Sequence, residues 1–438
     1  MTSTPATTTP SPTARSYDLV VQGARLLSAE GEPASTVDIG VLDGTVAEVS
    51  AEVTRSARNA IAADGRLLTT GLVDLHTHVF PGGSYWGIHP DGIAASTGVT
   101  TWVDAGSAGA YTLASFIRTV ERFRVRTRAF LHISGLGLTG QTGESLVIAN
   151  VDTAAAIAAV QSHRDLVCGI KVRCDVNACG PHGLEPLQRA LTVAAETGLP
   201  VMAHIAYAPP GADEVLALLR PGDVVTHCCT AVASGLLDDG RPSAAVLAAK
   251  ERGVVFDLAH GSGGFGFNVA EAFIAGGVRP DVLSTDLHAR SVSGPVFDLP
   301  NVLMKAIALG FTLPEAFAAA TEVPARVAGL APRGASPRVG DQADLALWDL
   351  VDEEVPVADA HRGIRVSPVR ISNWATVIDG HLLPLALPEP RPSWLPASGW
   401  LATALGERDE RIRGAIAAPL LPADRIDEAF PIGEPEPR

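Results

Sequence analysis

The sequence predicts an α/β fold, a (β/α)₈ TIM barrel with a small β-sandwich domain formed from N- and C-terminal segments. Three observations predict it. Short apolar runs typical of buried strands alternate with helical stretches over roughly 260 residues, the size of one such barrel. On both sides of this region the pattern changes to runs typical of antiparallel strands. With 47% hydrophobic and 18% charged residues, the chain also has enough apolar material for a large core.

The composition excludes several classes of protein. In this chain of 438 residues, 33 Lys and Arg against 48 Asp and Glu give a net charge of −15, whereas nucleic acids and anionic membranes bind basic surfaces. The high apolar content excludes a disordered or fibrous protein. Five cysteines do not form a disulfide framework in so long a chain, so we expect buried free thiols and a cytoplasmic location. We find no signal-peptide pattern and no apolar run of ~18 residues, and expect no membrane span.

The small β domain is predicted from both ends of the chain. Residues 16–68 contain β-rich runs, and Asp43-Gly44 is a strong hairpin turn between two of them. Residues 335–385 return to the same kind of pattern. Because the ends of compact proteins often lie close together, we expect these two segments to form one composite small β domain.

The barrel is predicted for residues 69–334. Segments with helical spacing, such as residues 152–165, 184–198 and 241–253, lie between the strands, and several end at a glycine. The eight strand candidates are residues 71–78, 98–106, 127–134, 166–173, 199–205, 223–228, 253–260 and 281–286.

The two termini have a different composition. Residues 1–15 are rich in Thr, Pro and Ser, and we expect a disordered tail because they have no apolar face to bury. Residues 386–438 are Pro-rich around an amphipathic stretch, which is typical of an extension rather than a further domain.

Side chains that can bind metals end five of the predicted barrel strands. Active sites of this fold lie at the C-terminal ends of the strands, and side chains at positions i and i+2 of a strand point the same way. A lone strand histidine, such as His132, His260 or His89, is usually a core residue bonded to a neighbour, but six such groups at strand ends indicate a metal site. They are His76 and His78 on the first strand, Lys171 on the fourth, His204 on the fifth, His227 on the sixth and Asp286 on the eighth.

Lys171 is the most informative of these residues. The chain has only three lysines, Lys171, Lys250 and Lys305, and uses arginine elsewhere for positive charge. A lysine in an apolar strand therefore indicates chemistry that a guanidinium cannot perform. The amine could form a Schiff base, or add carbon dioxide and bridge two metal ions as a carbamate. The neighbouring histidines favour the carbamate.

The motifs GLVDLHTHVFPGG, GIKVR, GDVVTHC, FDLAHGSGGFGF, STDLH and GDQADLALWDL together resemble one family. Over roughly residues 17–380 the chain is similar to the amidohydrolase superfamily, in its dihydroorotase-like branch with a binuclear metal centre, and within it to amidohydrolase/deacetylase family metallohydrolases. The resemblance implies two divalent ions, and imidazole and carboxylate ligands favour Zn²⁺, although manganese or iron would also fit. It implies one ion held by His76, His78 and Asp286 and a second by His204 and His227, with N6-carboxylated Lys171 between them.

The same resemblance implies the reaction. A metal-bridging hydroxide would attack an amide or ester carbonyl, and Asp286 would pass its proton to the leaving group, so the function is deacylation of small acylated amino or hydroxy acids. The alternative is a cyclic amidase of the dihydroorotase or hydantoinase kind. A non-catalytic homologue is disfavoured, because none of the six ligands is missing. We expect a small-molecule substrate, no nucleic-acid or membrane partner, and a homo-oligomer.

Four further residues are candidate substrate contacts. Arg173 lies on the same strand face as Lys171 and could bind a carboxylate, or form a salt bridge at the barrel rim. Gly263 and Gly264 lie in the glycine-rich segment after the seventh strand, where a small acyl pocket could form. His288 follows Asp286 by two residues and is expected to touch the substrate or a residue around the metal ligands, rather than the metals.

Overall fold

The computed structural model describes residues 15–27, 36–232 and 234–386. The predicted tail of residues 1–15 and the predicted extension of residues 386–438 therefore lie outside the described residues, apart from residues 15 and 386.

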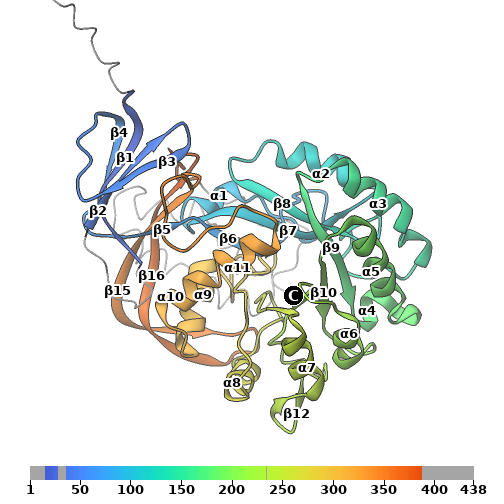
Figure 1. Cartoon of the computed structure of the whole chain (residues 1–438). Helices are drawn as coiled ribbons and strands as arrows, with labels where there is room; N and C mark the ends of the chain where they lie inside the picture. Colours follow the sequence, from blue (N-terminus) through green and yellow to red (C-terminus); the bar gives the residue numbers. More distant parts are fainter. Residues whose placement is uncertain (1–14, 28–35, 233, 387–438) are drawn as a thin grey trace, which may run out of the picture.

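A curved parallel sheet forms the centre of the larger part of the molecule (Figure 1). Its strands coincide with seven of the eight predicted ones and follow the order β14-β11-β10-β9-β8-β7-β6, so each strand pairs with its neighbour along the barrel. The strands are β6 (Leu72–Thr77), β7 (Val99–Gly109), β8 (Arg126–His132), β9 (Val167–Cys174), β10 (Val201–Ile205), β11 (Val224–Thr226) and β14 (Val255–Asp257).

The eighth predicted strand, residues 281–286, is not a regular strand. Isolated parallel bridges join Asp257 to Val282 and Thr77 to Leu287, so this segment spans the gap between β14 and β6. On the β14 side the His260 and Gly261 amides donate to the Ser284 and Thr285 carbonyls at 3.2 Å and 2.9 Å. On the β6 side the Asp74 carboxylate accepts hydrogen bonds from the Thr285 amide at 3.0 Å and the Thr285 hydroxyl at 2.5 Å. The arrangement fits a TIM-like barrel.

Helices cover the outer side of these strands (Figure 1). The three predicted segments at residues 152–165, 184–198 and 241–253 contain α3, α5 and α7, and Gly198 and Gly253 end α5 and α7 in the left-handed conformation. The helices are α1 (Asp91–Ala94), α2 (Leu113–Val120), α3 (Thr153–Ser162), α4 (Val176–Cys179), α5 (Glu185–Thr197), α6 (Ala212–Leu218), α7 (Ala244–Arg252), α8 (Phe267–Ala275), α9 (Leu299–Ala308), α10 (Leu313–Ala318) and α11 (Glu322–Val327), with 3₁₀ turns at Ile148–Asn150 and Gly180–His182 and a small hairpin of β12 (Leu237–Asp238) and β13 (Arg241–Pro242).

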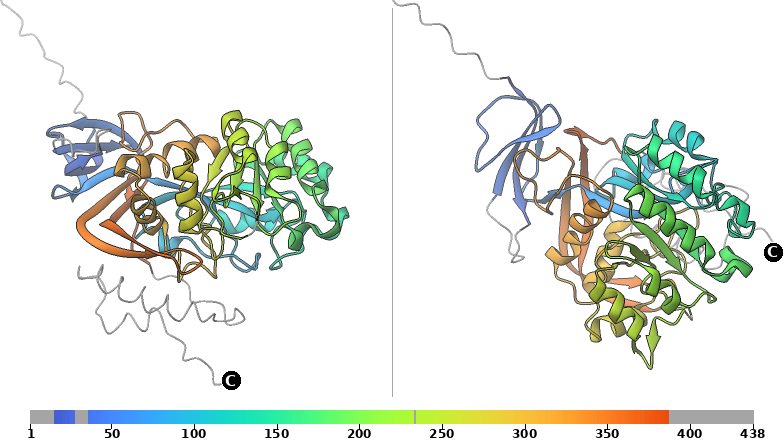
Figure 2. Two further views of the ribbon diagram at one scale, coloured as in Figure 1. Left: turned by 90° about the horizontal axis from the view of Figure 1, so that it is seen from below. Right: turned by 45° about the vertical axis from the view of Figure 1, so that its right-hand side comes forward.

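A second sheet joins the two ends of the chain, and Figures 1 and 2 show its blue and orange strands side by side. Leu345 pairs with Thr70 across the two segments, and the predicted Asp43-Gly44 turn links β2 to β3 with positive φ at both residues. All eight strands belong to one sheet, so the predicted sandwich is not confirmed. The strands are β1 (Tyr17–Leu26), β2 (Thr36–Leu42), β3 (Thr45–Ser50), β4 (Ala57–Ala62), β5 (Leu67–Thr70), β15 (Leu345–Ala358), β16 (Ile364–Ile378) and β17 (His381–Leu382).

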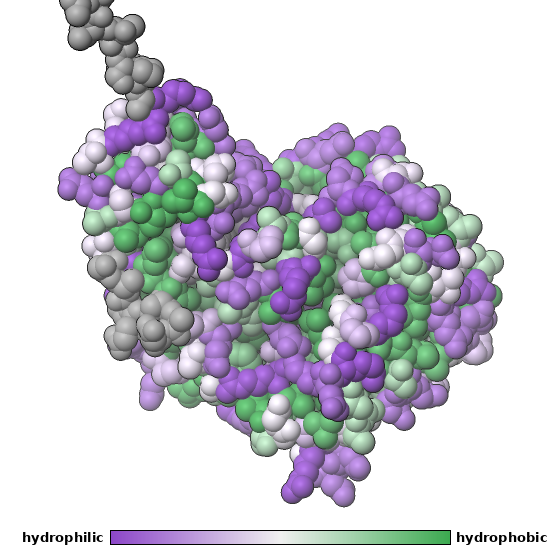
Figure 3. All heavy atoms as spheres, viewed as in Figure 1, coloured by the Kyte–Doolittle hydropathy of each residue, from purple (hydrophilic) through white to green (hydrophobic). Residues whose placement is uncertain are grey.

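The hairpin of β15 and β16 reaches from this small sheet to the barrel. At its tip the Asp359 carboxylate accepts a hydrogen bond from the Phe267 amide at 2.9 Å, and the Ala360 amide donates to the Phe265 carbonyl at 3.1 Å. On the face drawn in Figure 3, an indentation of the outline lies between the small sheet and the barrel. The small sheet thus contacts the loop that follows β14.

Separate apolar cores fill the barrel interior, the space between strands and helices, and the small sheet. All five cysteines are free and buried, as predicted for small apolar residues. Within the described residues, no helix is both long and apolar enough to cross a membrane.

Candidate metal centre

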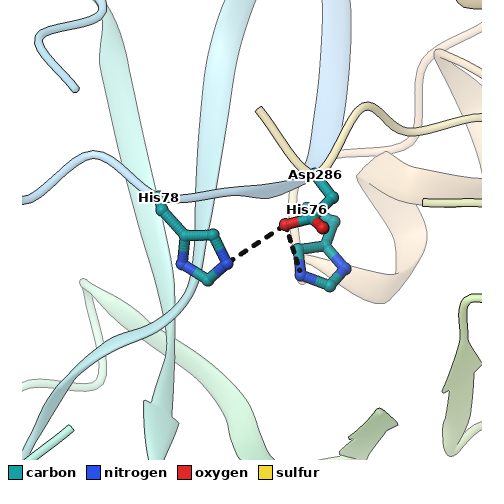
Figure 4. A group of neighbouring side chains, drawn as sticks. All are labelled: His76, His78 and Asp286. Carbon is teal, nitrogen blue, oxygen red and sulfur yellow. Dashed lines mark ion pairs between the residues drawn. The ribbon is translucent and has the colours of Figure 1, made fainter. Parts of the chain in front are cut away.

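His76, His78 and Asp286 meet at the C-terminal ends of the first and eighth barrel segments (Figure 4). The Nε2 atoms of His76 and His78 lie 3.4 Å and 3.2 Å from the same Oδ1 of Asp286. One ligand atom from each of the three residues lies within 4.8 Å of the others, and all three side chains are buried. The structure therefore gathers the three residues predicted to hold the first metal ion.

A chain of hydrogen bonds sets the tautomer of His76. Its Nδ1 lies 2.8 Å from the Thr226 hydroxyl, which donates to the Asp257 carboxylate at 2.8 Å. The Thr226 hydroxyl donates its only proton to the hydrogen bond with Asp257, so its oxygen accepts a hydrogen bond from His76 Nδ1. His76 Nε2 is then unprotonated and faces Asp286. Burial raises the pKa of Asp257 to about 6, so its carboxylate is mainly ionised at neutral pH and can accept this bond.

A hydrogen bond at Nδ1 also orients His227. Its Nδ1 lies 2.7 Å from the Ala259 carbonyl, which can only accept, so Nδ1 carries the proton. Its Nε2 lies 4.0 Å from Asp286 Oδ2. His78 is held by Ser107, whose hydroxyl lies 3.0 Å from its Nδ1. Such outer contacts fix which ring nitrogen is available to a metal.

Lys171 lies among these histidines. Its Nζ is 3.3 Å from His76 Nε2 and 3.4 Å from Met202 Sδ, and the residue is 1% exposed. Burial lowers the pKa of Lys171 to about 7, against the opposing effect of Asp286. A substantial fraction of the amine is therefore neutral at pH 7, the form that reacts with carbon dioxide. A Cβ at Gly106 would lie 2.6 Å from Lys171 Cγ, so a glycine is needed beside it.

His204 occupies the edge of the centre. Its ring lies 4.5 Å from that of His227, and its Nε2 lies 3.6 Å from an oxygen of Asp175. In the part of the chain that the structure describes, the compact group of metal-capable atoms does not include His204 or His227. The residues predicted for the second metal ion are thus neighbours but are more widely spaced.

Asp286 is the acidic centre of the group. Burial alone would raise the pKa of Asp286, but His288, His78 and His227 outweigh that effect and hold its pKa below the ordinary value. Its φ of 48° is in the left-handed region, as are the φ values of His227 (63°) and Ala259 (39°). Non-glycine residues in this conformation are strained, and such strain clusters at functional sites.

Arg173 is already paired. Its guanidinium forms two hydrogen bonds with the Glu144 carboxylate, at 2.7 Å and 2.5 Å, and two with the Gln141 carbonyl at 3.3 Å. Both Arg173 and Glu144 are buried. Of the two predicted roles, the structure shows the salt bridge at the barrel rim.

His288 is buried beside Asp286, with its Nε2 3.8 Å from Asp286 Oδ2. Burial lowers the pKa of His288 to about 4, so the ring is neutral. Because its Nδ1 accepts from the Arg290 amide at 3.1 Å, the proton is on Nε2 and points towards the centre. Gly264 packs against His227, whereas Gly263 is exposed.

Several residues of the centre escaped the sequence analysis. Asp74, Asp104 and Asp257 are fully buried carboxylates on the first, second and seventh strands. They accept hydrogen bonds from Thr285, from Val79 and Ser107, and from Thr226, respectively. Each stands in an apolar strand run, which is the signal in the sequence that could have found them. Thr226 had no such signal, because threonine is common in strands.

Comparisons of the sequence with known proteins agree on one family. The model of the "Amidohydrolase family" matches residues 67–380. A deacetylase of Enterococcus faecalis is 32% identical over 371 residues, which cover 84% of this chain and 99% of the relative. A deacetylase of Agrobacterium fabrum is 33% identical over 338 residues, 76% of this chain and 83% of the relative.

Solved structures agree with this fold. A structure described as an adenine deaminase superposes with a TM-score of 0.79 at 31% identity, covering 84% of this chain and 99% of that one. A structure described as a dihydroorotase gives a TM-score of 0.75 at 30% identity, covering 83% of this chain and 97% of that one. These two descriptions differ in substrate, so the likeness alone does not fix the substrate of this chain.

Proposed function

This chain belongs to the amidohydrolase family and is a hydrolase that acts on C–N bonds, and from that premise we propose that it is a metal-dependent deacylase of small acylated amino or hydroxy acids. The observation that carries the proposal is the convergence of the Nε2 atoms of His76 and His78 on one oxygen of a buried carboxylate. Relatives named deacetylase, which match three quarters or more of this chain, support the acyl substrate.

The donor set fits divalent ions, which this family generally uses. Imidazole nitrogens with free lone pairs beside a carboxylate suit Zn²⁺, and a buried neutral lysine suits carbamate formation. We assign one ion to His76, His78 and Asp286 and a second to His204 and His227, with N6-carboxylated Lys171 between them. Ions held there would lower the pKa of a water molecule and supply hydroxide at neutral pH.

The two oxygens of Asp286 have different surroundings. Its Oδ1 faces His76 and His78, whereas its Oδ2 faces His227 at 4.0 Å and His288 at 3.8 Å. We assign the proton transfer to Oδ2, which takes the proton of the attacking water and delivers it to the leaving nitrogen or oxygen. The Nε2 proton of His288 can hold this oxygen or a substrate oxygen in place.

A second candidate is the hydrolysis of a cyclic amide. The structural relative described as a dihydroorotase, at 30% identity, favours it. The two candidates share the metal centre and differ only in whether the acyl group is part of a ring.

A substrate panel tests the proposal. The purified protein, with its metal content measured, is assayed on N-acetyl amino acids of both configurations, acetyl esters of hydroxy acids, dihydroorotate and hydantoins. We expect about two divalent ions per chain and turnover of acyclic acyl substrates, both lost in His76→Ala and retained in His381→Ala, which changes an exposed histidine. Turnover of the cyclic amides alone would favour the second candidate, and a metal-free wild-type protein would refute both.

We also propose that the enzyme is cytoplasmic and that it forms a homo-oligomer. Five buried free thiols are typical of a protein kept in a reducing compartment.

A further inference from the structure

A second buried lysine lies behind the candidate metal centre. Lys305 on α9 and His260, which follows β14, are both fully buried. Lys305 Nζ lies 2.8 Å from His260 Nε2 and donates to the Pro295 carbonyl at 2.6 Å. Burying an ammonium group is costly unless specific partners compensate for the lost water. The pair therefore calls for an explanation, and the proposed chemistry does not use it.

The hydrogen bonds of His260 fix its ring. Its Nδ1 lies 2.9 Å from the Gly261 carbonyl, which can only accept, so Nδ1 carries the proton. The lone pair of Nε2 then accepts a hydrogen bond from Lys305. Burial, followed by the charge of Lys305, holds the pKa of His260 well below its ordinary value, in agreement with a neutral ring. His260 is thus tied to α9 on one side and to its own loop on the other.

The loop of residues 259–266 forms a wall of the metal centre. The Ala259 carbonyl accepts the hydrogen bond that orients His227. A Cβ at Gly264 would lie 2.2 Å from His227 Nδ1, and a Cβ at Gly261 would lie 2.1 Å from Asp286 Oδ2. The backbone of this loop is therefore in close contact with two residues of the centre.

The same loop has a strained backbone. Ala259 has a φ of 39° and Gly261 a φ of 52°. A left-handed alanine is unfavourable by itself and persists only where surrounding contacts impose it. A glycine adopts the conformation of Gly261 readily, so the strain lies at Ala259. His260 directly follows Ala259, so its bond to Lys305 acts next to the strained residue.

We propose that Lys305 is a positioning residue of the hydrolase. Through His260 it holds the loop of residues 259–266 in its strained conformation, and through Ala259 and Gly261 it sets the orientation of His227 and Asp286. The inference rests on the proposed function, but it also predicts an effect on metal binding that needs no substrate.

The test compares Lys305→Met with Lys250→Met. Lys250 is the matched control, because it is a lysine bound to a carboxylate, Asp281, at 2.6 Å and does not contact this loop in the contacts described. For each variant we would measure Zn²⁺ affinity by competition with a chelator, the melting temperature, and kcat and KM for metal-loaded protein. Loss of an outer partner of a metal ligand typically costs 10–100-fold in affinity or rate.

We expect Lys305→Met to weaken Zn²⁺ binding and to lower kcat at least ~10-fold, with KM changed less than ~3-fold, and Lys250→Met to do neither. His260→Gln is a second variant, because its amide can accept from Lys305 and donate to Gly261, and it should retain more affinity and rate than Lys305→Met. If Lys305→Met does not fold, His260→Gln is compared with His260→Leu, and equal affinity in those two would overturn the proposal.

A folded Lys305→Met protein with wild-type Zn²⁺ affinity and kcat would also overturn it. So would a lower melting temperature with unchanged Zn²⁺ affinity and unchanged kcat of the loaded enzyme, because that result shows a purely structural role. If the wild type turns over no acyl substrate, the proposed function fails, while weaker Zn²⁺ binding by Lys305→Met still supports the positioning role.

Discussion

In His76 and His227 the Nδ1 atom bonds to another residue of the protein, and the Nε2 atom is available to a metal ion. His76 donates to Thr226 and His227 to Ala259, and burial keeps the pKa of both rings below the ordinary histidine value. A protonated imidazole cannot bind a metal, so neutral rings of fixed tautomer are what a divalent ion requires. The fold therefore sets both the charge and the tautomer of these two rings.

Lys171 gives the sharpest prediction at this scale. Lys171→Ala should lose activity and regain part of it with added short-chain carboxylic acids, which can replace a carbamate. Lys171→Arg should lose both activity and metal, because a guanidinium does not react with carbon dioxide. Metal analysis and initial rates measure the outcome. Full metal content and full rate in Lys171→Arg would rule out the carbamate.

Asp286 is predicted to move the proton. Asp286→Asn should lower kcat by ~10²-fold or more, the usual worth of a positioned acid or base, while substrate binding and the fold survive. His288→Asn should have a smaller effect, because His288 acts beside Asp286 rather than on the water. Steady-state kinetics with a melting curve separates the two, and an unchanged kcat would remove Asp286 from the mechanism.

The pair of Glu144 and Arg173 is predicted to stabilise the fold. Burial raises the pKa of Glu144, but Arg173 and His132 outweigh it, so the folded pKa lies below the ordinary value. The pair therefore stabilises the protein above the unfolded glutamate pKa of ~4.3, and this contribution is lost as the pH falls below it. Glu144→Gln should be less stable by ~3–5 kcal/mol at pH 7.

The pH dependence is the check on that prediction. The stability difference between Glu144→Gln and the wild type should shrink as urea unfolding is repeated from pH 7 towards pH 3. Glu185→Gln is the control, because both side chains of its pair with Arg189 are partly exposed and pairs near the surface contribute less than ~1 kcal/mol. A difference that stays constant with pH would contradict the ion-pair explanation.

Among the elements, the regular ones were predictable and the loops were not. Seven strands and the three helices α3, α5 and α7 coincide with the predicted segments, because apolar runs, N-caps and terminal glycines are local signals. The segment at residues 281–286 was wrongly expected to be a regular strand. On its β6 side the Thr285 amide bonds the Asp74 side chain instead of a backbone carbonyl, and no local signal shows a side chain from another strand.

The candidate site also has features that the sequence predicts and features that it does not. Its residue types and strand-end positions were visible in the sequence, whereas the pairing of Arg173 with Glu144, which comes from the loop after β8, depends on tertiary contacts.

The loop after β14 provides a matched test at the element scale. Gly264→Ala should disturb His227 and reduce metal content, because its Cβ would lie 2.2 Å from His227 Nδ1. Gly263→Ala should keep the wild-type metal content, because no atom lies within 4 Å of its Cβ position. Metal analysis after gel filtration compares the two directly. Equal metal content in both would show that the loop is not in close contact with the centre.

At the scale of the whole molecule, strands from both ends of the chain flank the barrel. β15 pairs with β5, and the tip of the hairpin of β15 and β16 contacts the loop after β14. Arg126 in the barrel also bonds Asp344 of the small sheet region at 2.8 Å. The small sheet thus contacts and supports a loop of the candidate metal centre. The domain boundaries at residues 16–68, 69–334 and 335–385 stay a prediction.

The last prediction concerns the two terminal segments outside the described residues. Removing residues 2–14 should leave activity and melting temperature unchanged, because a Thr/Pro-rich segment has no apolar face to bury. The C-terminal segment is different, because Trp394, Trp400 and Leu401 begin a pattern too apolar to remain in water.

We therefore expect the C-terminal segment to dock against the barrel or a neighbouring subunit. A chain truncated at Pro388 should expose apolar surface, and so either melt several degrees lower or elute as a different oligomer on a sizing column. The variant that lacks residues 2–14 is the control, because it also loses a terminal segment but one without an apolar face. A truncated protein with the same solubility, melting temperature and elution volume as the full chain would show that the segment stabilises neither the fold nor an assembly.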